Sequence, residues 1–269
     1  MAALADTTAR IEREQEFHDT RFGDDSARSG ATKYYRAVEA GPAFYRQRVR
    51  DLAGPGAAAL EYGCGVGSRA FELASTGTSV TGIDISPVAI ATARSEAERR
   101  GCDADARFVV ANAEDTGLDA AAFDIICGSG ILHHLDLDAA TDELARLLTA
   151  DGTAVFLEPL GHNPLINWYR SRTPEMRSVD EHPLLRGDIE AISQRFHVRT
   201  RCFGLTAIAG GWLSRIPVVG RRLPSLLNAV DRVLLSVGPM RWYAWMIVLE
   251  LRPKATRRPF APGRASDPC

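Results

Sequence analysis

A glycine-rich turn is the strongest local chemical signal in the chain. The segment ALEYGCGVGSRAFELA places Gly63, Gly65 and Gly67 between an apolar run and a helical one. Glycine accepts positive φ and lets a ligand approach the backbone closely. Ser68 stands where the dinucleotide fingerprint has its third glycine. The turn therefore favours a ligand with an ammonium and a carboxylate over a pyrophosphate, and Glu61, at the end of the preceding strand, could compensate such an ammonium.

A carboxylate ends the next apolar run. Asp84 closes VTGID, 19 residues beyond Gly65. An acid at that place can accept both hydroxyls of an adenosine ribose, a charge-assisted contact that contributes about 1.5–3 kcal/mol. Capping of the helix that begins near Pro87 is a second, compatible role. We interpret Asp84 as a ribose ligand.

Two histidines follow the fourth predicted strand. That strand ends at residues 128–130, and His133 and His134 come directly after it. Ligands collect at the carboxyl ends of parallel strands, where a histidine can act as general base toward a phenol, hydroxyl or amine. A structural role for both at the head of a helix is the alternative. Glu158, at the end of the fifth strand, could reach the same place.

The elements that must position these groups follow the pattern of an α/β protein. Short apolar runs alternate with amphipathic stretches, which is typical of a parallel sheet covered by helices. The predicted strands are 57–62, 79–85, 106–112, 123–130 and 153–159, with helices at 68–75, 87–100 and 138–149. Helices at 1–20 and 33–52 precede them; a helix at 188–196, a strand at 197–205, a helix at 222–237 and a strand at 242–251 follow. We predict a doubly wound, mostly parallel sheet.

Composition and charge exclude several functions. The 269 residues carry 32 basic and 34 acidic side chains, a formal net charge of -2 that would not draw the chain to nucleic acid or an anionic bilayer. The five cysteines form no CxxC pair and no zinc spacing, so we expect a reducing cytoplasm and no metal. The N-terminus lacks the apolar region of a secretory signal, and no apolar run is long enough to span a bilayer.

Taken in order, the motifs resemble a known family. LEYGCGVG, GIDIS, NAED, FDII with ILHHL, and the turn TADG before FLEP cover about residues 55–160. They are similar to the class I S-adenosylmethionine-dependent methyltransferases, in the branch with many small-molecule and quinone-biosynthesis enzymes. The resemblance implies a seven-stranded Rossmann-like sheet. Its last two strands would be an antiparallel pair, and the closing strand would lie between the fifth and the sixth.

The resemblance also implies where S-adenosylmethionine would bind. The loop 63–67, Cys64 included, would hold its methionine part, Asp84 with Ile85 its ribose, and 112–114 its adenine. The family usually has Asp where this chain has Asn112, whose amide oxygen can still accept from the adenine amino group. The predicted cofactor residues are Glu61, Gly63, Cys64, Gly65, Gly67, Asp84, Ile85, Asn112, Ala113, Glu114 and Ser129.

In related enzymes the first residue of such a histidine pair faces the transferred methyl group. We therefore expect His133, with Glu158, to be catalytic and His134 to support the substrate side. Residues 1–54 would form a helical lid, 55–251 the methyltransferase domain with a cap inserted at about 160–187, and 252–269 a disordered tail. Trp168 and Tyr169 could equally be core residues. The predicted substrate residues are Phe17, His18, Tyr34, Tyr35, His134, His162, Trp168, Tyr169, Arg172 and His182.

The sequence thus predicts an enzyme that moves a methyl group from S-adenosylmethionine to an oxygen or nitrogen of a small metabolite, in bacterial secondary metabolism. We expect a monomer or homodimer in the cytoplasm, without nucleic-acid or membrane partners. One alternative is an NAD(P)-dependent oxidoreductase on a similar sheet, against which Ser68 argues. Another is a non-catalytic cofactor-binding protein.

Overall fold

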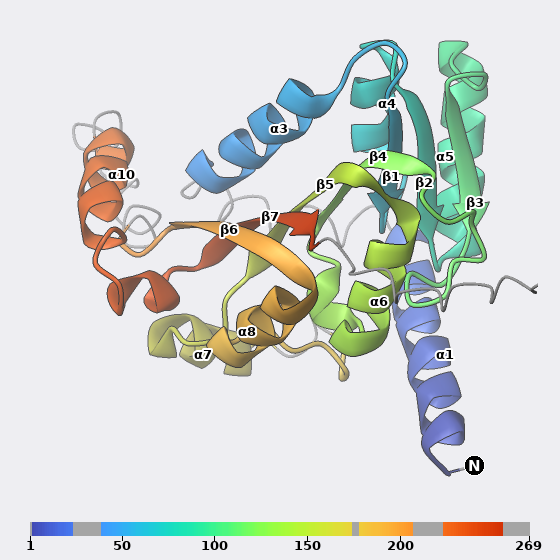
Figure 1. The fold of residues 1–269 in the computed structure, drawn as a ribbon. Coiled ribbons are helices and arrows are strands. Elements are labelled where there is room, and N and C mark those ends of the chain that lie inside the picture. Colours follow the sequence, from blue (N-terminus) through green and yellow to red (C-terminus); the bar gives the residue numbers. More distant parts are fainter. Residues whose placement is uncertain (1, 24–38, 174–177, 207–222, 255–269) are drawn as a thin grey trace, which may run out of the picture.

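The computed structural model describes residues 2–23, 39–173, 178–206 and 223–254. They form one seven-stranded sheet in the order β3-β2-β1-β4-β5-β7-β6 (Figure 1). The strands are β1 (Ala58–Tyr62), β2 (Ser79–Asp84), β3 (Ala106–Val110), β4 (Phe123–Ser129), β5 (Leu148–Pro159), β6 (Phe196–Phe203) and β7 (Met246–Pro253). The helices are α1 (Ala2–Gly23), α3 (Ala40–Leu52), α4 (Ser68–Ala74), α5 (Pro87–Arg100), α6 (Leu137–Leu147), α7 (Pro164–Ser171), α8 (Arg186–Arg195) and α10 (Leu223–Leu234), with short 3-10 helices η2 (Leu132–His134) and η4 (Met240–Tyr243).

The strand directions confirm the predicted fold class. Strands β1 to β5 pair in parallel, whereas β7 is antiparallel to both β5 and β6. The last strand of the chain thus lies between the fifth and the sixth. The order reverses between β1 and β4, and at such a point the carboxyl ends of the strands leave a crevice for ligands.

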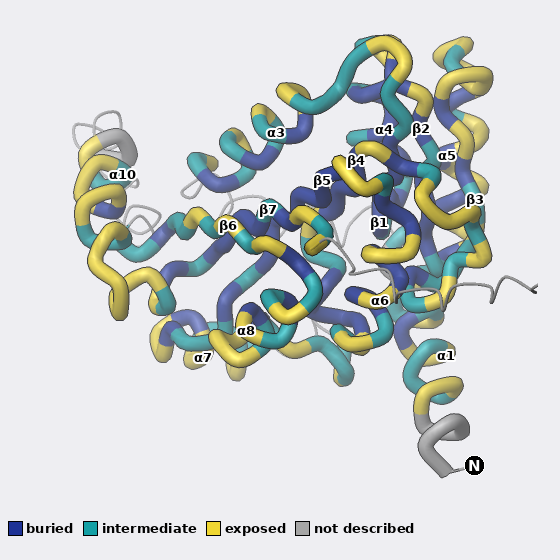
Figure 2. Tube along the Cα trace, viewed as in Figure 1, coloured by how far each residue is buried: buried dark blue, intermediate teal, exposed yellow. Residues whose placement is uncertain are grey.

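Two apolar layers hold the sheet, one on each face. On one face, α6 and α8 pack against side chains that include Phe156 and Leu249. On the other, α3, α4 and α5 pack against side chains that include Ile125 and Val155. The dark blue of the central strands in Figure 2 shows that both faces are buried. This explains why these strands read as nearly continuous apolar runs.

Helix boundaries follow local capping signals. The side chain of Ser86 accepts a hydrogen bond from the backbone N–H of Ala89, and Pro87 occupies the first turn of α5. Gly101, at φ 65°, ends that helix in the left-handed conformation. The cap of α5 is therefore Ser86, which corrects the suggestion that Asp84 caps it.

Several predicted boundaries were wrong. The final strand begins at Met246 because 240–243 form η4, and it extends through Pro253 into the predicted tail, since Arg252 and Pro253 pair with β6. The segment predicted as an inserted cap, about residues 160–187, includes α7, which Asn163 caps with its side chain and Pro164 begins. The predicted helix at 33–52 is confirmed over Ala40–Leu52. Its residues 33–38, and the tail from 255 onward, lie outside the described residues.

Candidate active site

A cavity of about 560 Å³ lies at the carboxyl ends of the parallel strands. This size is ordinary for a small-molecule site. The strand ends supply one wall and α1 supplies another. Of the predicted cofactor residues, those that line it are Gly63, Asp84, Ile85, Asn112, Ala113, Glu114 and Ser129. Glu61, Cys64, Gly65 and Gly67 do not line it.

The glycine turn adopts the conformations that require glycine. Gly63, Gly65 and Gly67 have φ values of 62°, 52° and 84°. A Cβ on Gly67 would also lie 2.8 Å from the Phe108 ring. Substitution of this glycine would therefore cause both backbone strain and a steric clash.

Asp84 fixes the turn as well as facing the cavity. Its Oδ2 accepts a hydrogen bond from the Gly65 N–H at 2.8 Å, and its Oδ1 accepts one from the Ser86 N–H at 2.9 Å. Burial raises the pKa of Asp84, while these two hydrogen bonds oppose the shift. Each carboxylate oxygen keeps a lone pair for a ligand hydroxyl.

Glu61 lies behind the turn. Its Oε2 accepts a hydrogen bond from the Ala70 N–H in α4 at 2.7 Å. Burial raises the pKa of Glu61 to about 8, although the Ala70 hydrogen bond and the charge of Arg69 lower it. Contact with a ligand ammonium would need a bridging water or a backbone shift.

The segment predicted to bind adenine, residues 112–114, contains a local turn and takes part in an ion pair. The Oδ1 of Asn112 accepts a hydrogen bond from the Glu114 N–H at 3.0 Å. Glu114 binds Nη2 of Arg10 through both carboxylate oxygens, at 2.6 and 2.7 Å, and accepts the Asp136 N–H at 2.8 Å. Arg10 also donates to the backbone oxygen of His134 at 3.0 Å. The Asn112 oxygen thus has one lone pair left for a ligand amino group.

The two predicted catalytic residues form a buried pair. Nδ1 of His133 lies 2.7 Å from Oε2 of Glu158, which is fully buried, while Oε1 accepts the N–H groups of Ile131 and Leu132 at 2.9 and 3.0 Å. With this hydrogen-bond pattern Glu158 acts as an acceptor, so Nδ1 carries the hydrogen and Nε2 keeps its lone pair. His133 lines the cavity and Glu158 does not, because the carboxyl group is directed at the loop that carries the histidine.

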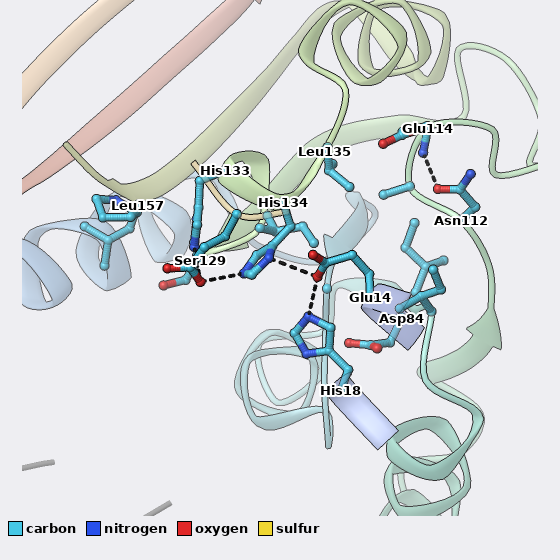
Figure 3. Close-up of a pocket in the computed structure, with 18 of the residues that line it drawn as sticks. Glu14, His18, Asp84, Asn112, Glu114, Ser129, His133, His134, Leu135 and Leu157 are labelled. Atoms are coloured by element: carbon cyan, nitrogen blue, oxygen red, sulfur yellow. Dashed lines mark hydrogen bonds and ion pairs between the residues drawn. The ribbon is translucent and has the colours of Figure 1, made fainter. Parts of the chain in front are cut away.

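His134 connects the sheet to α1. Its Nδ1 lies 3.1 Å from Oε2 of Glu14, and Nε2 of His18 lies 3.6 Å from the same oxygen (Figure 3). Burial would raise the pKa of Glu14, but hydrogen bonds with His134, His18 and Ser178 hold it well below its ordinary value. Burial lowers the pKa of His134 more than Glu14 raises it. Near neutral pH the structure thus combines an ionised Glu14 with a neutral His134.

The other predicted substrate residues are divided. His18, His134 and Tyr169 line the cavity. Phe17 packs edge-on against His18, outside the cavity lining. Four predicted substrate residues do not line the cavity: His162, Trp168, Arg172 and His182. The Arg172 guanidinium stacks over the half-exposed Trp168 ring. The exposed His182 donates its backbone N–H to the backbone oxygen of His133. Tyr34 and Tyr35 lie outside the described residues.

The sequence predictions included His18 but missed the other three residues of a stripe on α1. Arg10, Glu14, His18 and Phe22 recur at every fourth position, and all four line the cavity. Phe22 lies over the turn, where a Cβ on Gly65 would come within 3.0 Å of its ring. The i, i+4 spacing of one helix face was visible in the sequence, but nothing there indicated what that face contacts.

Comparisons with known proteins agree with this geometry. Residues 60–156 match the family model described as a methyltransferase domain. Aklanonic acid methyltransferase DauC of Streptomyces sp. (strain C5) is 34% identical over 120 residues, 42% of this chain and 54% of that protein. The ubiquinone biosynthesis O-methyltransferase of Pseudomonas paraeruginosa is 32% identical over 109 residues, 40% of this chain and 47% of that protein. The chain thus spans about half the length of these two curated relatives.

A solved structure shows the same fold over most of the chain. Geranyl diphosphate C-methyltransferase from Streptomyces coelicolor A3(2) aligns with a TM-score of 0.59 and 16% identity, covering 79% of this chain and 81% of that chain. The strand order and the crevice at the carboxyl ends of the strands define a Rossmann-like α/β fold, which this solved structure shares. Residues 60–156 match the methyltransferase-domain model, and both curated relatives are named methyltransferases, which confirms the predicted resemblance.

Proposed function

We propose that the protein transfers a methyl group from S-adenosylmethionine to an oxygen or nitrogen of a small metabolite. One observation carries the proposal. The cavity that collects Gly63, Asp84 and Glu114 also contains His133, which Glu158 holds in a defined tautomer. A donor site and an oriented proton acceptor therefore share one space.

The proposed reaction is an in-line displacement at the methyl carbon of the sulfonium. The acceptor's oxygen or nitrogen forms the new bond to that carbon while the carbon–sulfur bond breaks, and S-adenosylhomocysteine leaves. Nε2 of His133 takes the acceptor's proton, and Glu158 stabilises the imidazolium that results. The enzyme otherwise acts by holding the two reactants in line and away from water.

Further parts of the proposal concern substrates, location and assembly. The names of the relatives, an aklanonic acid methyltransferase and a ubiquinone biosynthesis O-methyltransferase, support a small-molecule acceptor and are consistent with bacterial secondary metabolism. A cytoplasmic location is supported by the free thiols of Cys64, Cys102, Cys127 and Cys202. No helix of the described residues is long and apolar enough to cross a membrane. We propose a monomer or homodimer that binds no nucleic acid.

Ligand-induced thermal stabilisation distinguishes the main alternative. We expect S-adenosylhomocysteine to raise the melting temperature and NADH to leave it unchanged, because a ligand that binds only the folded state stabilises it. Stabilisation by NADH alone would favour an oxidoreductase. Binding of S-adenosylhomocysteine without methyl transfer to any acceptor in a metabolite extract would favour a non-catalytic binding protein.

The role of His133 has its own test. We expect His133→Ala to lower turnover by about 10²–10⁴-fold, the range typical of a lost general base, with unchanged affinity for S-adenosylhomocysteine. Glu158→Gln should also lower turnover, since an amide can present a donor to Nδ1 and favour the other tautomer. A loss below about tenfold in His133→Ala would reduce the histidine to a positional role.

A further inference from the structure

Three side chains that the proposed reaction does not use meet at the boundary between α1 and the sheet. Glu14 and His18 come from α1, and His134 comes from η2 (Figure 3). Their ligand atoms, one carboxylate oxygen and two imidazole nitrogens, all lie within 4.8 Å of one another. All three side chains line the cavity.

The Glu14 carboxylate is buried, and its contacts with the neighbouring donors have poor hydrogen-bond geometry. Glu14 is only 4% exposed, and neither of its side-chain oxygens has a hydrogen-bond partner of good geometry, although His134 and His18 are at ion-pair distance. A buried carboxylate without donors is costly unless a cation compensates it. The guanidinium of Arg10, one turn earlier on α1, is already paired with Glu114.

The spacing of the ligand atoms fits a metal ion. Zinc-type bonds to nitrogen and oxygen of about 2.0–2.2 Å place neighbouring ligand atoms about 3.0–3.5 Å apart in octahedral or tetrahedral geometry. Oε2 of Glu14 lies 3.1 Å from Nδ1 of His134 and 3.6 Å from Nε2 of His18. Small side-chain rotations would suffice to place all three atoms around one ion.

The surroundings of His134 also suit a ligand. Metal-bound histidines usually donate their other ring N–H to a carboxylate. Oε2 of Glu181 lies 4.0 Å from Nε2 of His134 and can take that place. His133 is a weaker ligand candidate, because Glu158 already engages its Nδ1.

We propose that Glu14, His18 and His134 form a binding site for one first-row divalent transition-metal ion. Two imidazoles and one carboxylate favour ions such as Zn²⁺, Fe²⁺ or Co²⁺ over Mg²⁺ and Ca²⁺, which prefer oxygen ligands. Three protein ligands leave coordination positions open, and the ligand residues line the cavity, so water or an acceptor oxygen could complete the shell. Coordination of an acceptor oxygen rests on the proposed function, whereas the metal site itself does not.

Cobalt titration tests the site without using activity. The full chain is stripped with a chelator and titrated with Co²⁺, while the visible absorption of the bound ion is recorded. We expect saturable binding of one ion per chain that excess Mg²⁺ does not displace. Glu14→Gln should weaken binding by about 100-fold or more, since loss of even an outer partner costs about 10–100-fold. Glu16→Gln, at an exposed position of the same helix, is the matched control and should bind as the wild type does.

Each result decides the proposal. It is overturned if the wild type shows no saturable Co²⁺ binding, or if Glu14→Gln binds Co²⁺ as tightly as the wild type does. Circular dichroism establishes whether Glu14→Gln folds; if it does not, His18→Asn, which changes a partly exposed side chain, replaces it with the same expected loss. S-adenosylhomocysteine binding is measured in the metal-free samples. Normal binding there with no Co²⁺ site would overturn the metal proposal and leave the proposed function standing.

Discussion

Burial changes the acid–base chemistry of Glu61. Burial raises its pKa from 4.5 to about 8, so the folded chain holds a proton there that the unfolded chain has already released. Between these two values the unfolded state binds fewer protons than the folded state. The free energy of unfolding must therefore fall as the pH rises through this window, and the contribution of Glu61 to stability is complete only below it.

Urea denaturation at several pH values tests this effect. From about pH 5 to about pH 8, the wild type should lose stability relative to Glu61→Gln by at most about 1.4 kcal/mol per pH unit. Glu98→Gln, at an exposed position of α5, should retain the wild-type dependence. An identical pH dependence in Glu61→Gln and the wild type would show that Glu61 ionises normally in the folded state.

At the scale of elements, α1 lies against the strand ends through contacts with distant segments. Arg10 pairs with Glu114, Asp19 hydrogen-bonds Ser86, and Phe22 lies over Gly65. These contacts support the predicted lid, which would have to open for a cofactor to exchange. The pair of Arg10 and Glu114 is the strongest of them by geometry, because one guanidinium nitrogen reaches both carboxylate oxygens.

Truncation of Arg10 tests whether α1 retains the cofactor. We expect Arg10→Ala to speed dissociation of S-adenosylhomocysteine by about tenfold and to raise hydrogen exchange in α1. It removes charge-assisted hydrogen bonds, which contribute about 1.5–3 kcal/mol each, from a largely buried Glu114. Stopped-flow kinetics measures the rate. Arg99→Ala, which removes an exposed arginine of α5, is the control. Equal dissociation rates in the two variants would argue against a lid.

At the scale of the whole molecule, the apolar clusters on the two faces of the sheet stabilise the folded state, while the cavity lies at the carboxyl ends of the strands. Phe156 belongs to the larger buried cluster, and its fully buried ring meets Tyr62 edge-on with centroids 6.1 Å apart. We expect Phe156→Ala to lower the free energy of unfolding by about 3–5 kcal/mol, measured by chemical denaturation, because it leaves a cavity in a close-packed core. Val179→Ala, at a position 94% exposed, should change it by less than about 0.5 kcal/mol. A Phe156→Ala loss no larger than this control's would mean that the ring is loosely packed.

The sheet and its glycine turn could be predicted from the order of residues alone. Strands buried on both faces must be apolar throughout, and positive φ requires glycine, so both features are written locally in the chain. The antiparallel closing strand came only from the resemblance to a known family. Asp84 was predictable as a cavity residue, because it ends a parallel strand close to the point where the strand order reverses, and strand ends there face the ligand crevice.

The pairs of side chains that meet across the cavity depend on how the folded elements pack together. Arg10 and Glu114 are 104 residues apart, and Glu14 reaches His134 from another element, so no periodicity or spacing could pair them. Glu158 was predicted to reach the reacting groups, but the fold directs it at Nδ1 of His133 and two backbone N–H groups. A strand pattern fixes where a residue is placed. The direction of a buried polar side chain depends on which donors the packed neighbours bring within reach.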